Sequence, residues 1–164
     1  MKWALTTLMM SFIMITFWLW QIDGSMALLA NGRLKNGINR AAHDASLEVD
    51  KAQLTNGKIV FNSNAALNTF KNTIAANLVL DDQLIPQPNT LFNRPIAITY
   101  MDFIDDLDGI TYPYLYENTM YGISKIIYGP AVIFAIETDK PQPFNISDEY
   151  MMVKWAVFEY PIPR

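Results

Sequence analysis

The feature that most constrains this chain is an uncharged apolar segment close to its N-terminus. Residues 3–20 read WALTTLMMSFIMITFWLW and contain no charged side chain. As a helix, these residues rise about 1.5 Å each and span roughly 27 Å, close to the thickness of the hydrocarbon core of a bilayer. Trp3 lies at one end and Trp18 and Trp20 at the other, where indole side chains favour a membrane–water interface. The sequence therefore predicts one helix that must be covered by lipid or by protein.

Three interpretations of this segment are open. It resembles a cleaved secretory signal, because Lys2 gives a positive start and Ser25-Met26-Ala27 offers small residues around a cut after Ala27. It also resembles a buried helix of a soluble protein, although a helix that is apolar on every face needs a large domain around it. The third interpretation is a retained membrane anchor, or a stem that packs against copies of itself. We favour the third, because the apolar run is longer than a usual signal core and ends in tryptophans.

Length and charge place the rest of the chain outside this stem. With 164 residues, we expect the stem at 1–24, an amphipathic continuation of the same helix at 25–54, and one outer domain at 55–164. Residues 54–164 carry seven basic and twelve acidic side chains, a net charge of −5. This charge argues against nucleic acid as the main partner, because phosphates require a positive surface. The chain has no cysteine, which excludes disulfides and thiolate metal sites, and we expect no cofactor.

The pattern of apolar residues predicts an α+β fold, in which the long N-terminal helix and a second helix pack on a small antiparallel sheet. The second helix is expected at about 64–80, after the capping residues Asn62-Ser63-Asn64. Short β-prone segments separated by Gly and Pro then predict a sheet of about four strands. The candidate strands are 58–61, 96–103, 110–116, 124–128, 131–138 and 150–160.

Mostly small apolar residues recur at spacings of three and four in the second half of the long helix. They predict a seam for helix packing rather than a binding site, made by Leu34, Ile38, Ala41, Ala45 and Val49. On the opposite side, Arg40 and Asp44 are spaced to form an ion pair. Gly24 and Gly32 each weaken a helix by about 1 kcal/mol, and the sequence leaves open whether the helix continues through them.

The sequence offers few candidate residues for metal binding or catalysis. Asp105, Asp106 and Asp108 form a candidate calcium site, because calcium prefers several carboxylate and carbonyl oxygens on a loop that contains glycine. The spacing differs from an EF-hand, and a solvated hairpin turn with an acidic tip explains the run equally well. His43 is the single histidine, and Asp44 points about 100° away on an ideal helix, so we predict no paired site there. Motifs of hydrolases and nucleotide-binding enzymes are missing, and we expect no enzymatic activity.

Two further patterns have simple explanations. Several aromatic residues suggest a carbohydrate-binding or base-stacking surface. Aromatic residues are also ordinary strand and core residues, and we favour this second interpretation. The residues concerned are Tyr112, Tyr114, Tyr116, Tyr121, Tyr128 and Trp155. Asn145-Ile146-Ser147 matches the glycosylation sequon by pattern alone.

The order of these features resembles that of the small pilin-like proteins of tight-adherence (TadE/TadF-type) and related type IV pilus systems. The resemblance lies in the stem MKWALTTLMMSFIMITFWLW, the following RLKNGINRAAHDASLEVD and the outer domain. The segments LTNGKIVFNSNAALNTFKNTIAANLVLDD and PAVIFAIETDKPQPF are similar in layout to pilus-associated proteins of Gram-positive bacteria. The chain departs from the type IV pattern in lacking a leader with a glycine cut site and a glutamate at the start of the stem. We therefore expect the stem to be retained without cleavage.

The resemblance implies a structural subunit of an extracellular surface filament, held in the cell membrane before assembly. Its partners would be copies of itself in a helical polymer, other pilin-like subunits, or assembly-platform proteins. The alternative is a single-pass, membrane-anchored surface protein, or a minor pseudopilin-like component of a secretion or pilus machine that binds a partner. In either case the expected contact residues are those of the stem: Trp3, Leu5, Leu8, Met9, Phe12, Ile13, Ile15, Phe17, Trp18, Leu19 and Trp20.

Overall fold

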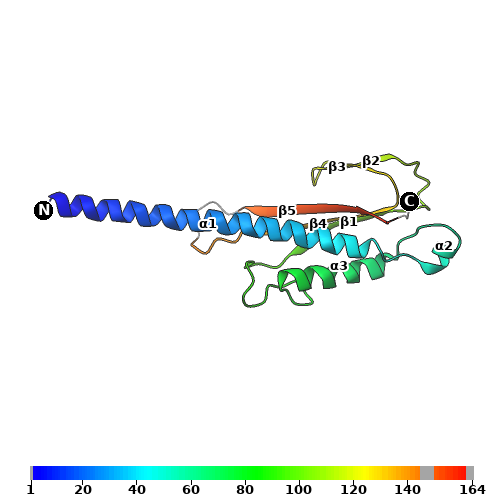
Figure 1. Ribbon diagram of the computed structural model, residues 1–164, viewed down its shortest axis with the longest axis horizontal. Coiled ribbons are helices and arrows are strands. Elements are labelled where there is room, and N and C mark those ends of the chain that lie inside the picture. The colour runs from blue at the N-terminus through cyan, green and yellow to red at the C-terminus, as the bar shows by residue number, and fades with distance from the viewer. Residues whose placement is uncertain (1, 145–149, 162–164) are drawn as a thin grey trace.

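The computed structural model describes residues 2–144 and 150–161, and its fold is α+β, as the sequence predicts. The sequon at 145–147 lies outside the described residues. The N-terminal part of the first helix projects as a single rod, and the remaining elements gather around its other end (Figure 1). The helices are α1 (Lys2–Ala45), α2 (Lys51–Thr55) and α3 (Ser63–Leu78). The strands are β1 (Ala97–Ile104), β2 (Tyr114–Asn118), β3 (Ile123–Ile127), β4 (Ala131–Asp139) and β5 (Met151–Glu159).

Helix α1 is continuous from the stem into the globular part. Its 44 residues form a rod of about 66 Å at about 1.5 Å per residue. Gly24 and Gly32 both lie inside this helix and neither interrupts it. The segment between them, SMALLAN, is rich in Ala, Leu and Met, which are strong helix formers and offset the low helix propensity of the glycines.

Helix α1 ends at Ala45, so the prediction that it continues to residue 54 is wrong. Directly after the end, the hydroxyl of Ser46 donates to the carbonyl oxygen of His43 over 2.6 Å and satisfies a backbone acceptor of the last turn. A separate short helix, α2, begins after Asp50. The carboxylate of Asp50 accepts the backbone N–H of Ala52 at 2.8 Å, which is the usual contact of an N-cap. These two local side-chain contacts divide the predicted helix.

Helix α3 forms close to its predicted position and lies alongside the second half of α1 (Figure 1). Its first turn is capped by Asn62, whose side chain accepts the backbone N–H of Ala65 at 3.1 Å. It ends where Val79 adopts a left-handed conformation with a φ of 59°. The residues on its buried face recur every four positions and are Ala66, Phe70, Ile74 and Leu78.

The strands form two sheets, whereas one sheet of about four strands was expected. Strands β1, β4 and β5 make a three-stranded antiparallel sheet with β4 in the centre, and β2 pairs with β3 in a separate hairpin. The segment 58–61 is not a strand, because only Phe61 makes an isolated bridge, to Val49. Local alternation of apolar residues marks a strand but does not specify its partner, which is why the pairing was not predictable.

The central strand β4 is buried on both faces and belongs to two cores. Val132, Phe134 and Ile136 face the helices, where the ring of Phe134 stacks on Phe70 with centroids 4.0 Å apart. Ile133 points the opposite way, into a smaller core below the β2–β3 hairpin. The continuous apolar run AVIFAI at 131–136 is typical of a strand that is covered on both sides.

The β2–β3 hairpin is attached to the three-stranded sheet by polar as well as apolar contacts. Tyr116 donates to Asp102 Oδ2 at 2.8 Å, Tyr100 donates to the same oxygen at 3.0 Å, and the two phenol oxygens are 2.6 Å apart. Burial, together with hydrogen bonds to Tyr100 and Asp102, raises the pKa of the Tyr116 phenol. Lys125 adds a bond of 2.7 Å from its Nζ to the carbonyl oxygen of Val157 on β5. The hairpin therefore forms an outer layer over the sheet.

Candidate functional site: the exposed apolar stem

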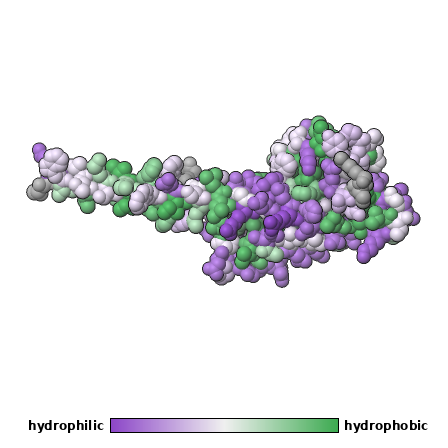
Figure 2. Space-filling view, viewed as in Figure 1, coloured by the Kyte–Doolittle hydropathy of each residue, from purple (hydrophilic) through white to green (hydrophobic). Residues whose placement is uncertain are grey.

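The stem, residues 1–24, is exposed over almost its whole described length. Apart from Leu19, the exposed fraction of its large apolar side chains ranges from 45% at Ile22 to 87% at Trp3, and the first buried residue of α1 is Asp23. In Figure 2 the stem is mostly white and green, whereas purple hydrophilic residues concentrate over the globular part. Leu19 is half-buried, and the other predicted contact residues are exposed: Trp3, Leu5, Leu8, Met9, Phe12, Ile13, Ile15, Phe17, Trp18 and Trp20.

The hydroxyl groups of the stem are bonded to the backbone of the same helix. Thr6, Thr7, Ser11 and Thr16 each donate to the carbonyl oxygen four residues earlier, over 2.9–3.0 Å. A hydroxyl bonded in this way needs no water, so it can enter an apolar environment at little cost. The stem therefore presents an almost entirely apolar surface although it contains four hydroxylated residues.

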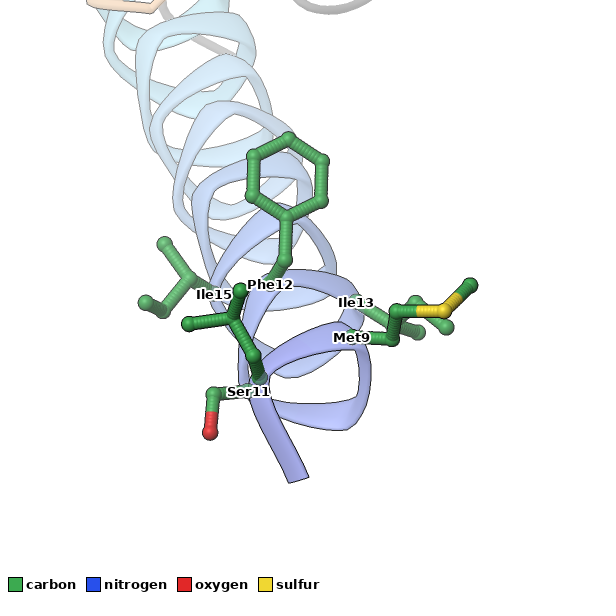
Figure 3. A pocket seen from close by; sticks show the side chains of 6 residues that line it. Met9, Ser11, Phe12, Ile13 and Ile15 are labelled. Carbon is green, nitrogen blue, oxygen red and sulfur yellow. The ribbon is translucent and has the colours of Figure 1, made fainter. Parts of the chain in front are cut away.

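The described side chains in the middle of the stem form an open surface. A hollow near its middle is lined by residues of this helix alone. Met9 and Ile13 point to one side of the helix, while Phe12 and Ile15 point in other directions (Figure 3). Side chains that diverge from one helix cannot surround a small molecule, so the stem is suited to contact with lipid chains or with other apolar helices.

By length and composition, α1 is able to cross a membrane. Its most apolar window of 18 residues has a mean hydropathy of 1.6, and no part of that window is buried in the fold. A single apolar helix near the N-terminus is typical of a membrane anchor or of a signal sequence. The exposure of the window excludes the interpretation that this segment is the core helix of the described domain.

The stem joins the globular part at a buried carboxylate. Asp23 is fully buried, and its Oδ1 accepts the backbone N–H of Phe144 at 3.1 Å. Burial of a carboxylate is costly unless hydrogen bonds replace water, and this contact supplies one of them. It fastens the segment that follows β4 to α1 at the point where the stem begins.

The predicted packing seam lies inside the domain. Leu34, Ile38, Ala41 and Ala45 are fully buried in the core between α1, α3 and the sheet, and Val49 is partly buried against the same core. The seam is therefore occupied by contacts within the chain and is not part of the exposed stem.

A lysine covers the edge strand β5 from the α1 side. Lys35 Nζ donates to the carbonyl oxygen of Trp155 at 2.6 Å and lies 4.9 Å from the centre of its indole ring. Burial, followed by the nearby charges of Lys154 and Lys125, lowers the pKa of Lys35. An edge strand whose carbonyl groups are occupied by lysines is protected from pairing with another strand.

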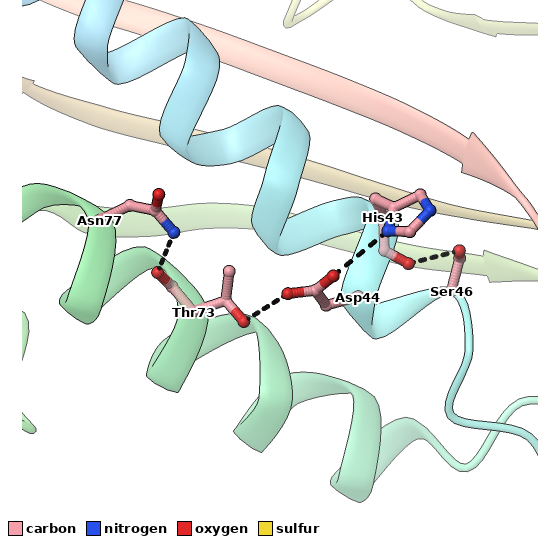
Figure 4. A network of polar contacts seen from close by, with 5 residues as sticks. All are labelled: His43, Asp44, Ser46, Thr73 and Asn77. Atoms are coloured by element: carbon pink, nitrogen blue, oxygen red, sulfur yellow. Dashed lines mark hydrogen bonds and ion pairs between the residues drawn. The ribbon is translucent and has the colours of Figure 1, made fainter.

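The region around His43 is a structural network at the end of α1. His43 Nδ1 lies 3.2 Å from Asp44 Oδ1, so the prediction that these neighbours do not pair is wrong (Figure 4). The reason is Thr73 on α3, whose hydroxyl donates to the other carboxylate oxygen of Asp44 at 2.8 Å and orients it. In a nucleophile–base pair the hydroxyl would donate to the histidine ring instead. The network therefore links α1 to α3 and does not activate Thr73.

The predicted ion pair between Arg40 and Asp44 is not the contact that forms. Arg40 Nη1 donates to Asn77 Oδ1 at 3.0 Å, and Asp44 is engaged by Thr73, as described above. Both partners belong to α3, which packs directly beside α1 (Figure 4). Spacing along one helix could not anticipate partners from another element.

The three aspartates of the candidate calcium site bond to backbone groups. Asp106 Oδ2 accepts the N–H of Ile59 at 2.7 Å, Asp108 Oδ2 accepts the N–H of Asp105 at 2.8 Å, and Asp105 Oδ1 accepts the N–H of Leu107 at 2.9 Å. Among the described residues, no three His, Cys, Asp or Glu side chains gather as a metal site. The acidic loop thus holds the segment near Ile59 in place.

The acidic loop also affects the neighbouring Tyr112. Burial, followed by the charges of Asp106, Asp108 and Asp105, raises the pKa of Tyr112 to about 12. Its hydroxyl is buried and has no hydrogen-bond partner among the described atoms. Of the other predicted aromatic residues, Tyr116 is buried, Tyr121 and Trp155 are half-buried against the smaller core, and Tyr114 and Tyr128 are exposed.

Two contacts that position the stem and the hairpin were not anticipated from the sequence. Asp23 carried a signal in the sequence, since it is the one acidic residue within the stem. Asp102 and Tyr116 carried none, because they lie on strands of two different sheets, and only the packing of the hairpin on the three-stranded sheet brings them together. Comparison with known proteins finds no protein-family model, no curated protein and no solved structure that matches this chain. The functional assignment therefore depends on the geometry of the chain itself.

Proposed function

We propose that this chain is a structural, pilin-like subunit of an extracellular surface filament, which is held in a membrane before assembly and assembles through its stem. The observation that carries the proposal is an apolar helix that is exposed over residues 3–22, except at the half-buried Leu19, and continues without a break into the globular part. An exposed apolar helix of this length must be covered, first by lipid and then by other stems. The function is structural and not enzymatic.

The energetics favour a role in assembly. Burying a Leu, Ile, Phe or Met side chain contributes about 1.5–3 kcal/mol relative to leaving it in water, and the stem exposes more than ten large apolar side chains. Lipid chains satisfy the same side chains, so transfer from lipid to a filament depends on how closely neighbouring stems pack. The four hydroxyl groups of the stem bond to the backbone of their own helix, so they do not oppose burial in either environment.

The first test introduces a charge into the stem. Leu8→Lys or Ile13→Glu is expected to abolish filaments, because a charge near the middle of an apolar helix costs about 2.5–3.5 kcal/mol when it is buried in a membrane. Met120→Lys is the matched control, since Met120 is 83% exposed on the β2–β3 turn. Electron microscopy of the sheared surface fraction measures the yield. Filaments of normal abundance from either stem variant would refute the proposal.

The second candidate function is a single-pass, membrane-anchored surface protein or a minor component of a secretion or pilus machine. It is favoured by the tryptophans at both ends of the apolar segment, which suit a helix that remains at two membrane interfaces. In that case the stem acts only as an anchor. Replacing residues 3–20 by a Leu/Ala helix of equal length should then preserve localisation and function, whereas a filament subunit should keep its membrane insertion and lose assembly.

A further inference from the structure

Two exposed glycines lie on α1 at and beyond the foot of the stem. Gly24, Leu28 and Gly32 are spaced by four residues and are all exposed, so they form one ridge along the helix. A Cβ atom placed on Gly24 or on Gly32 would meet no described atom within 4 Å. Glycine weakens a helix relative to alanine, yet the fold requires it at neither position.

Gly37, on the same helix, shows how this chain uses a glycine where another helix crosses. A Cβ atom at Gly37 would lie 3.1–3.3 Å from the side chain of Leu78 on α3, so the absence of a side chain permits the close contact of α1 with α3. By the same physical reasoning, Gly24 and Gly32 are suited to an apolar side chain that approaches from outside the chain.

A shallow groove lies beside the ridge. One wall comes from α1, at Gly24, Ala27 and Leu28, and the other from the start of β5, at Met151 and Val153. Leu28, Met151 and Val153 are 74%, 54% and 40% exposed, so apolar side chains border the groove on both sides. Because Gly24 and Ala27 belong to α1, the groove opens directly at the foot of the stem, and its lining combines these apolar residues with polar ones such as Asn31.

We propose that this groove and ridge accept the stem of a second copy of this chain; the inference deepens the proposed function and rests on it. Lys140 and Lys154 also line the groove and would attract lipid phosphates. Lipid and water are fluid, however, and adapt to alanine as easily as to glycine. Only a close-packed helix gains from the missing methyl groups. A second copy supplies such a helix, because each copy carries an exposed apolar stem that needs cover.

The first experiment measures the stability of the fold and the contact between copies separately. In the full chain, Gly24→Ala and Gly32→Ala should raise the unfolding temperature in detergent by about 2–4 °C each, because alanine favours the helix and its Cβ atom meets no atom of the described residues within 4 Å. Filament yield should fall about tenfold, since an added methyl group overpacks the contact between copies. Ser25→Ala, exposed on the neighbouring face of α1, is the control that should leave the yield unchanged. A lower unfolding temperature in either glycine variant would overturn the inference.

The second experiment detects the contact directly and does not require filaments. The chain has no cysteine, so Met151→Cys in one tagged copy can be oxidised together with Trp18→Cys, Trp20→Cys or Ile22→Cys in another copy within native membranes, where parallel stems lie at the same depth. A disulfide between copies is expected for at least one stem position, and Met120→Cys should give none with the same partners.

The outcomes distinguish the inference from the proposed function. Absence of every disulfide, with normal filament yield in the glycine variants, overturns the groove assignment and leaves the filament role standing. Disulfides in membranes from cells that form no filaments support the groove and count against the filament role. Equal disulfide yields from Met120→Cys and Met151→Cys would overturn the groove assignment, because they indicate random collision.

Discussion

The two halves of α1 have the same secondary structure and opposite surroundings. From Asp23 to Ala45 the helix buries a face against α3 and the sheet, and Leu34 and Ile38 are fully enclosed. From Lys2 to Ile22 the same helix contacts no core, although its side chains are larger and more apolar. The domain side uses small residues that let other elements approach, whereas the stem uses large residues on every face.

The difference shows that burial, not hydrophobicity alone, separates a core helix from an assembly helix. A core helix needs a polar face toward water, and the second half of α1 provides it with residues such as Arg33, Asn36 and Arg40. The stem has no such face, so its partner has to surround it. Mutations should therefore be able to change the stability of the domain without changing the membrane association of the stem, and the reverse.

The largest expected effect comes from removing the stem. A chain that begins at Asp23 should fold as a water-soluble monomer, because the buried residues of α1 begin at Asp23. Membrane association should be lost completely, since the apolar window has been deleted. Flotation of membranes and analytical ultracentrifugation measure the two properties. A truncated chain that unfolds or stays bound to membranes would show that the two halves of α1 depend on each other.

A matched pair of phenylalanines sharpens the comparison. Phe70→Ala should lower the unfolding free energy of the domain by about 3–5 kcal/mol, because Phe70 is fully buried and stacks on Phe134. Phe12→Ala removes the same side chain from the stem, where Phe12 is 73% exposed, and should change that free energy by less than about 0.5 kcal/mol. Denaturant unfolding in detergent, followed by near-ultraviolet circular dichroism, measures both. A similar loss of unfolding free energy in the two variants would contradict the idea that the stem does not contribute to the stability of the domain.

A smaller effect should appear at high pH, and only in the domain. The pKa values of Tyr112 and Tyr116 are higher in the fold than the usual value of about 10, mainly because of burial, and that of Tyr112 reaches about 12. The neutral phenols therefore stabilise the fold below pH 10, and this stabilisation is lost as the pH rises from about 10 toward 12. Denaturant titrations at about pH 9 and about pH 11 measure the change.

Substitutions of tyrosines test whether Tyr112 and Tyr116 cause this pH dependence. Tyr112→Phe with Tyr116→Phe should reduce the slope of the unfolding free energy above pH 10, whereas Tyr114→Phe, an exposed residue of the same hairpin, should not. The helicity of the stem should not respond, because residues 3–22 contain no ionisable side chain. An unchanged slope in the double variant would indicate that other groups cause the loss.

The sequence was sufficient for features that depend on local periodicity. The uninterrupted apolar run predicted the stem helix, and the spacing of Leu67, Phe70, Ile74 and Leu78 predicted an apolar face of α3, on which Leu67 is partly buried and the other three are buried. The seam at Leu34 and Ile38 was visible for the same reason. Each of these signals lies within a single element, where spacing alone defines a face.

Features that depend on contacts between distant segments were not predictable. The strands β2 and β3 form a separate layer that Tyr116 links to Asp102 on β1, and no pattern within either strand indicates that bond. The pairing of His43 with Asp44 was missed because Thr73, on another helix, sets the orientation of the carboxylate. The acidic loop was considered both as a candidate calcium site and as a solvated turn, and its actual partner, the backbone near Ile59, was not predictable because it lies far away in the sequence.

The unbroken passage of α1 through Gly24 couples the direction of the domain to the register of the stem. One residue inserted between Trp20 and Asp23 would rotate everything beyond it by about 100° and lift it by about 1.5 Å. Where neighbouring stems interlock, sliding one of them by a single residue would therefore turn the β2–β3 hairpin toward a different azimuth. In this way the register between neighbouring stems determines which surface of the domain lies on the outside of an assembly.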